Sequence, residues 1–411
     1  MPKDITRRSF FTTAAAGAAA MSIAPTIADA TTWKRPIEPL ILDKPLSLEE
    51  VPTPALVLDL DHMESNLKRM AEHSKKTGTG LRPHSKTHKC PIIAQKQIEL
   101  GAVGICCAKV SEAEVMSGAG IKNILITSPV TTRDKIARVI GVAQTNSGLQ
   151  MVVDNEKTAK DFNAAAKAAG ITLNVLIDLD VGTRRTGIRA GDDAVDLAKS
   201  VSRMKNLQFD GFQAYAGHVM HINGHESRSK MSIASMKRGL DVKKATEKAG
   251  IEVGIYTGGG TGTFDIDAGT NEITDLQVGS YLFMDVEYRA VGDKDSEIFD
   301  YFAPSLFVLA TTISQPSPRG GITIDAGFKS FAAENAKPEV YGIEGVGYQW
   351  FGDEHGLLLT KNAERKINLG EKIKLIVSHC DPTVNLYDYY YVLQDGKVSE
   401  LWPIAARGMS Q

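Results

Sequence analysis

Short runs of apolar and β-branched residues recur through most of the chain, and stretches with helical periodicity separate them. The runs most typical of strands are 55–60, 81–86, 104–110, 123–127, 150–154, 173–178, 209–215, 253–256 and 277–283. The clearest amphipathic patterns predict helices at 134–143, 156–169 and 192–204. This alternation is typical of parallel β/α units and indicates either an open doubly wound sheet or an eight-stranded barrel.

The pattern changes near Asp300 to short strands without comparably strong helices between them. The predicted strands are 305–314, 321–325, 356–361, 372–378 and 387–393. We therefore expect a C-terminal all-β domain.

A glycine cluster, Thr257-Gly258-Gly259-Gly260-Thr261-Gly262, directly follows the penultimate strand of the first region. Barrel enzymes often bind phosphate with the loops after their last two strands, because glycines let backbone amides approach the oxygens. The alternative is an ordinary glycine-rich turn. No GxGxxG fingerprint occurs early in the chain, so dinucleotide binding is disfavoured.

Lys86 ends an apolar run within Leu81-Arg82-Pro83-His84-Ser85-Lys86-Thr87-His88-Lys89, the setting expected of a Schiff-base lysine. A lysine acts as a nucleophile only where neighbouring cations or desolvation lower its pKa, and Arg82, His84, His88 and Lys89 would supply such cations. The alternative is a basic loop in water.

His379 and Asp381 lie in Ser378-His379-Cys380-Asp381-Pro382-Thr383, at the end of a predicted strand. On a strand their side chains would share one face, roughly 7 Å apart, while Cys380 points away. One imidazole and one carboxylate suit Mn, Mg, Co or Zn, with water completing the shell. A strand end capped by an Asp-Pro turn is the alternative.

Composition favours a small-molecule partner. The 411 residues are 43% hydrophobic with a formal net charge of -2, which offers no large basic field for nucleic acid. The four cysteines suggest no disulfide framework, since Cys106 and Cys107 are adjacent in an apolar run.

The N-terminus has the features of a twin-arginine export signal. Arg7-Arg8 precedes an apolar, Ala-rich run at 14–25 and the small-residue site Ala28-Asp29-Ala30. We expect residues 1–30 to be removed and the mature protein to be periplasmic, with no other stretch long enough to span a membrane. An Ala-rich tail or a membrane anchor is the alternative.

These motifs together resemble those of the D-threonine aldolase and D-serine dehydratase family. The resemblance covers essentially the whole mature chain and includes the Lys86 segment, 180–187, 215–218, the glycine cluster, 353–356 and 379–385. It implies pyridoxal phosphate, a divalent metal and an alanine-racemase-like fold, that is, an α/β chain with a (β/α)8 TIM-type barrel plus a C-terminal all-β domain.

The resemblance also implies a domain plan. Residues 31–60 would join the β domain, residues 61–292 would form the cofactor-binding barrel, and residues 293–411 would form the β domain with the metal site. The nine strand candidates then resolve into eight barrel strands and one strand contributed to the β domain.

Carried over residue by residue, the resemblance assigns Lys86 to the cofactor's Schiff base and Gly258, Gly259, Gly260 and Tyr281 to its phosphate. It assigns His379 and Asp381 to the metal, with manganese expected first. Arg185 would face the cofactor and Tyr215 would line its pocket, although a surface charge and a core residue remain the alternatives. His218 is a candidate catalytic residue and His355 a further pocket candidate, with structural histidines as the alternative; Asp353 and Glu354 would support the metal site.

The expected reaction is cleavage of a D-3-hydroxy amino acid to glycine and an aldehyde, because the resemblance associates His-x-Asp with aldolases and His-x-Cys with dehydratases. Dehydration of D-serine or D-3-hydroxyaspartate with the same cofactor and metal is the main alternative. A periplasmic racemase and a pyridoxal phosphate carrier are weaker ones. The family further suggests a homodimer.

Overall fold

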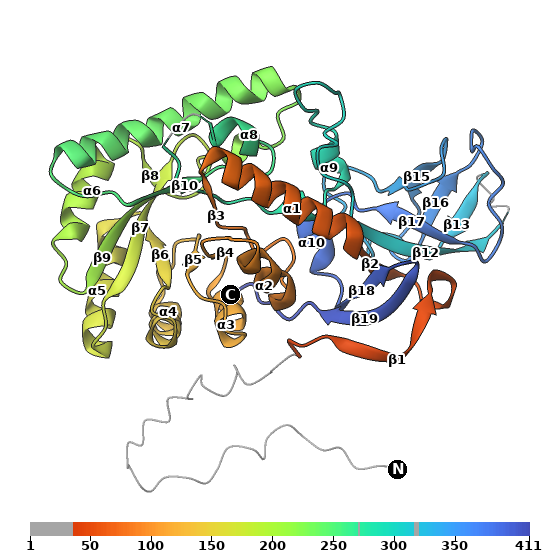
Figure 1. Cartoon of the computed structure of the whole chain (residues 1–411), viewed down its shortest axis with the longest axis horizontal. Helices are drawn as coiled ribbons and strands as arrows, with labels where there is room; N and C mark the ends of the chain where they lie inside the picture. The colour runs from red at the N-terminus through yellow and green to blue at the C-terminus, as the bar shows by residue number, and fades with distance from the viewer. Residues whose placement is uncertain (1–35, 270–271, 316–319) are drawn as a thin grey trace, which may run out of the picture. The chain divides into compact units, whose positions relative to one another are not determined.

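Eight parallel strands form a closed ring in the computed structural model, which describes residues 36–269, 272–315 and 320–411 (Figure 1). In ring order they are β3 (Gly80–Leu81), β11 (Asp275–Leu276), β10 (Ile255–Gly258), β9 (Leu207–Ala214), β7 (Leu173–Asp180), β6 (Gln150–Val153), β5 (Ile124–Ile126) and β4 (Ile105–Cys107). A parallel bridge between His84 and Cys106 joins the two ends. The predicted TIM-type barrel is confirmed; short β8 (Ile188–Arg189) pairs with β7 beside the ring.

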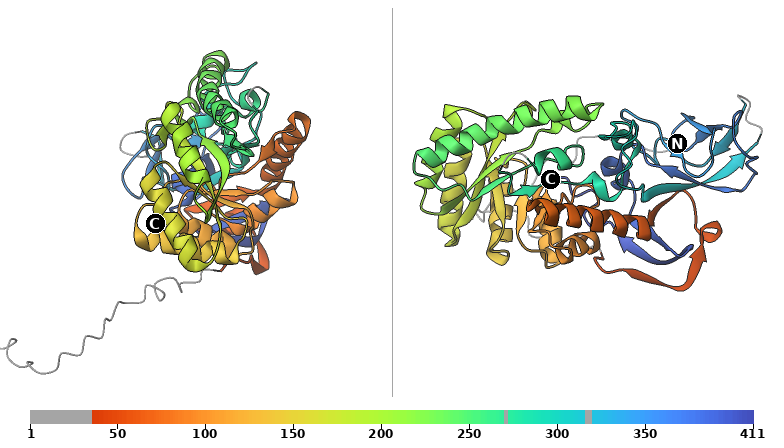
Figure 2. Two further views of the ribbon diagram at one scale, coloured as in Figure 1. Left: turned by 90° about the vertical axis from the view of Figure 1, so that its left-hand side faces the viewer. Right: turned by 45° about the horizontal axis from the view of Figure 1, so that its top comes forward.

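Helices surround these strands (Figure 2). The longer ones are α1 (Leu60–Thr77), α2 (Pro91–Glu99), α3 (Val110–Gly118), α4 (Arg133–Thr145), α5 (Glu156–Ala169), α6 (Asp192–Ser202) and α7 (His225–Lys248). Single turns follow at η3 (Gly217–Val219), α8 (Phe264–Asp267), η4 (Ser280–Leu282) and α9 (Val286–Arg289). The three helices predicted from periodicity correspond to α4, α5 and α6.

The helix ends follow from local chemistry. The side chain of Asp59 accepts a hydrogen bond from the His62 N–H at the start of α1, and Gly78 ends that helix with φ +73°. Asn155 and Gly170 play the same two roles for α5. An acceptor at the first position satisfies free N–H groups, and glycine adopts the left-handed ending without steric cost.

The second sheet forms the β domain, on the right in Figure 1. Its strands are β1 (Leu40–Ser47), β2 (Ala55–Asp59), β12 (Leu306–Ser314), β13 (Ile322–Ile324), β14 (Glu339–Val340), β15 (Gly347–Trp350), β16 (Gly356–Leu359), β17 (Lys372–Ile376), β18 (Tyr389–Gln394) and β19 (Lys397–Pro403). The short η2 (Leu48–Glu50) follows β1, and α10 (Cys380–Val384) follows β17. β2 pairs with β12 antiparallel and with β18 parallel, so this early segment does join the β domain.

Two strand predictions need correction. The run 277–283 is not a strand: β11 ends at Leu276, and η4 follows as a buried 3-10 turn, whose apolar composition resembles that of a buried strand. The expected strand through His379 and Asp381 ends instead at Ile376, and α10 begins at Cys380. Strands β1, β14, β15 and β19 were not anticipated, and the mostly exposed β1 shows why, since it lacks a clear apolar face.

The predicted export signal, residues 1–30, lies outside the described residues, and the predicted domain boundaries remain predictions. All four cysteines are free, as expected. No helix in the described part of the chain combines the length and apolar character needed to cross a bilayer.

Arg228 on α7 is 1% exposed and fastens the loops beside the barrel mouth. Its guanidinium donates to the carbonyls of Gly262 at 2.6 Å, Ile222 at 2.9 Å, Val291 at 2.9 Å and Gly292 at 2.7 Å. These carbonyls come from three segments, one of them the glycine cluster. One buried side chain therefore holds those segments together.

We expect Arg228→Met to lower the free energy of unfolding by at least about 3 kcal/mol, because several buried carbonyls lose their donor. Lys230→Met, on an exposed position of the same helix, is the matched control and should change it by less than about 0.5 kcal/mol. Urea unfolding measures both. Equal unfolding midpoints for the two variants would show that Arg228 does not fasten these loops.

Asp267 on α8 is buried and accepts hydrogen bonds from Ser232 at 2.6 Å and Thr263 at 2.5 Å. Burial raises the pKa of this carboxyl to about 6. In the unfolded chain an aspartate titrates near about 3.9, so the folded protein holds the proton more tightly. The resulting stabilisation is complete below pH about 4 and is lost as the pH rises through about 6.

Asp267→Asn removes this titration, and the stability advantage of wild type over the variant should therefore shrink by on the order of 2 kcal/mol between pH 4 and pH 7. Unfolding free energies of both proteins across that range measure the effect. Asp300→Asn, at an exposed loop position, should run parallel to wild type. A parallel profile for Asp267→Asn as well would refute the raised pKa.

Candidate active site

Lys86 lies just beyond β3, at the end of the barrel where the strands finish. Its loop is anchored on the barrel side by the Ser85 N–H, which donates to the Cys106 carbonyl at 2.8 Å. On the β-domain side, the Tyr390 hydroxyl donates to the His88 carbonyl at 2.7 Å. The Lys86 side chain itself remains 40% exposed. A rigid loop thus presents an accessible amine at the face where barrel enzymes place their chemistry.

The Lys86 ammonium forms an ion pair with Asp381, the second residue of α10. The surrounding protein atoms desolvate the Lys86 amine, which alone would lower its pKa, but the charge of Asp381 raises that pKa well above its ordinary value. Burial correspondingly opposes ionisation of Asp381, yet Lys86 and then His379 hold its pKa far below the usual range. The pair is therefore charged, with the proton on Lys86.

The cations expected to lower the Lys86 pKa do not do so. Arg82 pairs with buried Asp275 at 3.1 Å, and Lys89 pairs with buried Glu112. Each positive charge is compensated by its own carboxylate, so neither acts on Lys86 as predicted.

The two histidines of the segment are also not cationic neighbours. Burial lowers the pKa of His84 well below its ordinary value and that of His88 to about 4. His84 instead shapes the loop, because its Nδ1 accepts a hydrogen bond from the Lys86 N–H at 3.3 Å. The electrostatic argument for Lys86 was therefore wrong, and its assignment to the Schiff base stays a prediction.

The glycine cluster begins in the last two residues of β10, continues beyond that strand and is buried. A Cβ at Gly258 would clash with the Ala214 carbonyl, so packing requires glycine there, whereas one at Gly260 would lie 2.7 Å from Sδ of the flexible Met220 side chain. Among the described residues, no acceptor receives a hydrogen bond from the backbone N–H groups of 259–262. Buried N–H groups are costly without a partner, and consecutive ones in a turn form an anion-binding concavity. The cluster is thus suited to a phosphate group.

Tyr281 approaches this cluster through its main chain. Its backbone N–H donates to Thr261 Oγ1 at 3.0 Å, whereas its buried hydroxyl accepts from the Gln97 side chain at 3.2 Å. The hydroxyl is therefore committed to Gln97 on α2, and the phosphate role assigned to Tyr281 stays a prediction.

Tyr215 and Arg185 lie together, with the guanidinium carbon of Arg185 5.6 Å from the centre of the Tyr215 ring. Tyr215 is half-buried and lies near Lys86. The arginine is exposed but packed against an aromatic face near the lysine. The two residues therefore lie side by side, and their places beside the cofactor stay predictions.

His218, on η3, has both ring nitrogens engaged. Nδ1 lies 3.2 Å from Thr183 Oγ1, and Nε2 lies 3.3 Å from Ser235 Oγ. Burial and then Arg238 lower its pKa. These contacts favour the structural alternative over the catalytic role predicted for His218.

His221 was not among the predicted residues, yet the charge of Lys86 acts on it and is not among those that act on His218. Its ring is solvent-exposed and packs against Tyr288 with centroids 4.5 Å apart. Desolvation by neighbouring atoms lowers its pKa, and the charges of Asp285, His379, Lys86 and Asp381 also act on it. A second histidine three residues after His218, which is one turn of a 3-10 helix, was the available signal.

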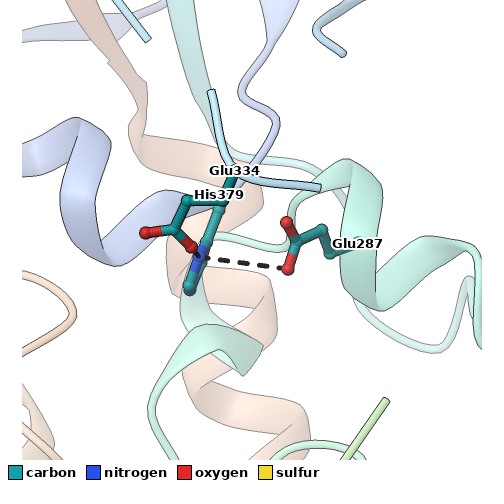
Figure 3. Close-up of side chains that lie close together, drawn as sticks. All are labelled: Glu287, Glu334 and His379. Carbon is teal, nitrogen blue, oxygen red and sulfur yellow. Dashed lines mark hydrogen bonds and ion pairs between the residues drawn. The ribbon is translucent and has the colours of Figure 1, made fainter. Parts of the chain in front are cut away.

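His379 immediately precedes α10 and meets two carboxylates that were not predicted (Figure 3). Its Nδ1 lies 3.2 Å from a Glu334 oxygen and 3.9 Å from a Glu287 oxygen. Among the described residues, these three form a group with the residue types and proximity needed for a metal ion. Asp381 is not in that group, because it faces Lys86.

The remaining candidates lie apart from this site. Glu354 pairs with Lys329, and both side chains are exposed. Asp353 and His355 are exposed in the same β15–β16 connection. No contact in the described structure supports their predicted role beside the metal or in the pocket.

Two family models match the chain. The alanine racemase N-terminal domain matches residues 58–287, and a serine dehydratase domain matches residues 305–393. D-threonine aldolase from Arthrobacter sp. is 39% identical over 89% of this chain and 95% of its own length. A 3-hydroxy-D-aspartate aldolase from Paracoccus denitrificans is 35% identical, covering 87% of this chain and 93% of its own.

Comparison with solved structures points to the same group of enzymes as the sequence relatives do. The crystal structure of D-threonine aldolase from Filomicrobium marinum superimposes with a TM-score of 0.86 at 37% identity, covering 90% of this chain and all of that one. D-threo-3-hydroxyaspartate dehydratase from Delftia sp. HT23 shares the fold, with a TM-score of 0.77 at 23% identity over 87% of this chain and 98% of its own. The chain therefore belongs to the D-threonine aldolase and D-serine dehydratase family of pyridoxal phosphate enzymes with the alanine racemase fold.

Proposed function

We propose that this protein is an aldolase that uses pyridoxal phosphate and a divalent metal to cleave D-3-hydroxy amino acids to glycine and an aldehyde. The observation that most directly supports this proposal is the ion pair between Lys86, from the barrel, and Asp381, at the start of α10. His379 lies beside the same carboxylate. The 35% and 39% identities to aldolases, against 25% to a dehydratase from Delftia sp., favour carbon–carbon cleavage.

The residues present fit the cofactor. Lys86 supplies an accessible amine, and the free N–H groups of 259–262 suit a phosphate. Arg185 and Tyr215 would flank the ring. When bound, pyridoxal phosphate supplies an electron sink for the electron pair left when the Cα–Cβ bond breaks.

The residues also fit a divalent metal, with manganese the first choice. His379 offers an imidazole, and Asp381 a carboxylate two residues later, a ligand combination typical of such ions. A cation bound there would polarise the substrate's β-hydroxyl oxygen.

The protein's own groups can move both protons that the reaction requires. His221, with its lowered pKa, is the neutral base that accepts the β-hydroxyl proton as the aldehyde forms. Asp381 keeps a proton on Lys86 Nζ, and Lys86 can donate it to Cα to complete glycine. Return of the His221 proton through solvent restores Lys86, so the reaction balances.

We further propose that the protein is exported by the twin-arginine route and works in the periplasm as a homodimer. The Arg7-Arg8 motif and the site at Ala28-Asp29-Ala30 support export. The dimer rests on the family resemblance alone.

The purified protein, loaded with pyridoxal phosphate and manganese, should convert D-threonine to glycine and acetaldehyde. EDTA should abolish turnover, because the cation polarises the reacting hydroxyl. Amino-acid analysis and an aldehyde assay measure the products, and Lys86→Ala serves as the inactive control. Ammonia with 2-oxobutyrate would instead establish the dehydratase alternative, and D-threonine turned over to its enantiomer would establish a racemase.

His221→Gln should lower kcat for this cleavage by about 100-fold or more with little change in KM, as expected for loss of a general base. His218→Gln should change kcat less and reduce stability instead, since that ring is held by two hydroxyl groups. His355→Gln, at an exposed loop position, is the control. Unimpaired turnover in His221→Gln, combined with loss in His218→Gln, would restore His218 as the catalytic residue.

A further inference from the structure

Two buried polar side chains lie near the ends of adjacent barrel strands. Asp178 on β7 is 4% exposed, and Gln213 on β9 is 3% exposed. The strands pair with these two residues side by side, and Gln213 Nε2 donates to Asp178 Oδ1 at 2.8 Å. Barrel interiors are usually filled by branched apolar residues, and a buried carboxylate is unfavourable without compensation. Packing alone therefore does not explain Asp178.

Gln213 connects Asp178 to strands that are not its neighbours. Its Nε2 group also donates to the Thr127 carbonyl, after β5, at 3.0 Å. Its Oε1 accepts from Gln277 Nε2, after β11, at 3.2 Å. Because neither β5 nor β11 lies beside β9 in the ring, the Gln213 side chain must extend into the barrel interior. Both amide hydrogens and the amide oxygen are engaged, so the orientation of the group is fixed.

The same contacts lead to the Lys86 loop. His84 Nδ1 accepts from the Lys86 N–H at 3.3 Å, so in the neutral imidazole the hydrogen lies on Nε2. That nitrogen lies 3.1 Å from Thr127 Oγ1 and can donate to it. Burial keeps His84 neutral, because it lowers the pKa of the imidazole well below its ordinary value. A continuous set of contacts thus links the Lys86 backbone to Asp178.

On its other side, Asp178 holds the loop that carries Arg185. Asp178 Oδ2 accepts from the Thr186 hydroxyl at 2.8 Å, one residue after the arginine. The Arg184 N–H, one residue before it, donates to Asp180 Oδ1 at 2.9 Å. Both sequence neighbours of Arg185 are therefore anchored to carboxylates of β7.

The charge of Asp178 favours the same arrangement. Burial raises its pKa to about 6, so the carboxyl is largely ionised at pH 7. The charge of Arg185 acts on it in the opposite sense to burial, and the charge of Asp154 acts in the same sense as burial. Opposite charges attract more strongly in a protein than in bulk water, so Asp178 helps to keep Arg185 over the Tyr215 ring.

We propose that Asp178 is a positioning residue for the pyridoxal ring, because it holds Arg185 beside that ring and in a fixed place relative to Lys86. This role rests on the proposed function, in which Lys86 bonds the cofactor and Arg185 flanks its ring. Asp178 acts at one remove, since its two oxygens accept from Gln213 and Thr186. Its loss should leave the ring bound to Lys86 but free to tilt.

Circular dichroism of the cofactor's visible band tests this role without substrate. In the full-length protein saturated with pyridoxal phosphate, the ratio of that signal to the absorbance reports how rigidly the ring is held. Asp178→Asn should lower the ratio by about twofold or more and weaken cofactor binding by about 10-fold or more, as expected for loss of a charged hydrogen-bond acceptor. Asp300→Asn, at an exposed position, is the matched control.

The tether to the loop can be removed separately. Thr186→Val should shift both quantities in the same direction but by less, about 3- to 10-fold in the dissociation constant, because one hydrogen bond is lost. Thr186→Ser keeps the hydroxyl and should restore the wild-type values. Thr131→Val, at an exposed position, is the control. If Asp178→Asn does not fold, these threonine variants decide the outcome.

A double variant separates positioning from general stability. If Asp178 acts through Arg185, Asp178→Asn should add less than about twofold to the change in dissociation constant caused by Arg185→Met. A purely structural carboxylate would instead lower the urea midpoint, leave the dichroism ratio of the saturated protein unchanged, and add its full effect to that of Arg185→Met.

Wild-type ratios in both Asp178→Asn and Thr186→Val, or full additivity in the double variant, would overturn the proposal and leave the aldolase reaction standing. A lowered, non-additive ratio in a protein that cleaves no D-3-hydroxy amino acid would sustain the role of Asp178 and refute the proposed function. Absence of the visible band from wild type would overturn both.

Discussion

The ion pair between Lys86 and Asp381 is the contact on which the site depends, because each partner comes from a different domain. The barrel alone would present a lysine with no carboxylate beside it, and the β domain alone would present a buried carboxylate with no cation. The ion pair keeps the proton on Lys86. It also places α10, and with it His379, at the barrel mouth. The His379 imidazole and the Lys86 amine are consequently held in one frame, which is the preorganisation that catalysis requires.

Much of the fold could be read from the sequence, since buried parallel strands and amphipathic helices follow different periodicities. The strand predictions were wrong where short buried segments show no periodic pattern of apolar residues. The run 277–283 is apolar like a strand, yet it turns as η4, and the segment after Ile376 becomes a helix that turns Asp381 away from the expected shared face. Local composition marks neither the end of β11 at Leu276 nor the end of β17 at Ile376.

The site shows a similar division. Lys86 and His379 stand in distinctive motifs, so sequence alone located them. Glu287 and Glu334 stand in no motif, and only the folded chain brings them beside His379. His221 was overshadowed by its neighbour His218, because sequence does not show which ring is already held by hydroxyl groups. The protonation state of Lys86 was likewise inaccessible, since it depends on Asp381 and not on the adjacent cations.

The position of β2 constrains the order in which the chain can fold during its synthesis. Val57 of β2 lies beside Tyr391 of β18, so this strand pair of the β domain joins residues that the ribosome produces early and late. Contacts of such long sequence separation form slowly, because a long loop must close before they contribute any stability. The barrel can assemble while synthesis continues, and β2 can pair with β12 once that strand has emerged, but the other edge of β2 stays unpaired until β18 follows. A nascent or truncated chain therefore exposes an open sheet edge, which makes interrupted synthesis the stage at which this protein is most prone to aggregate.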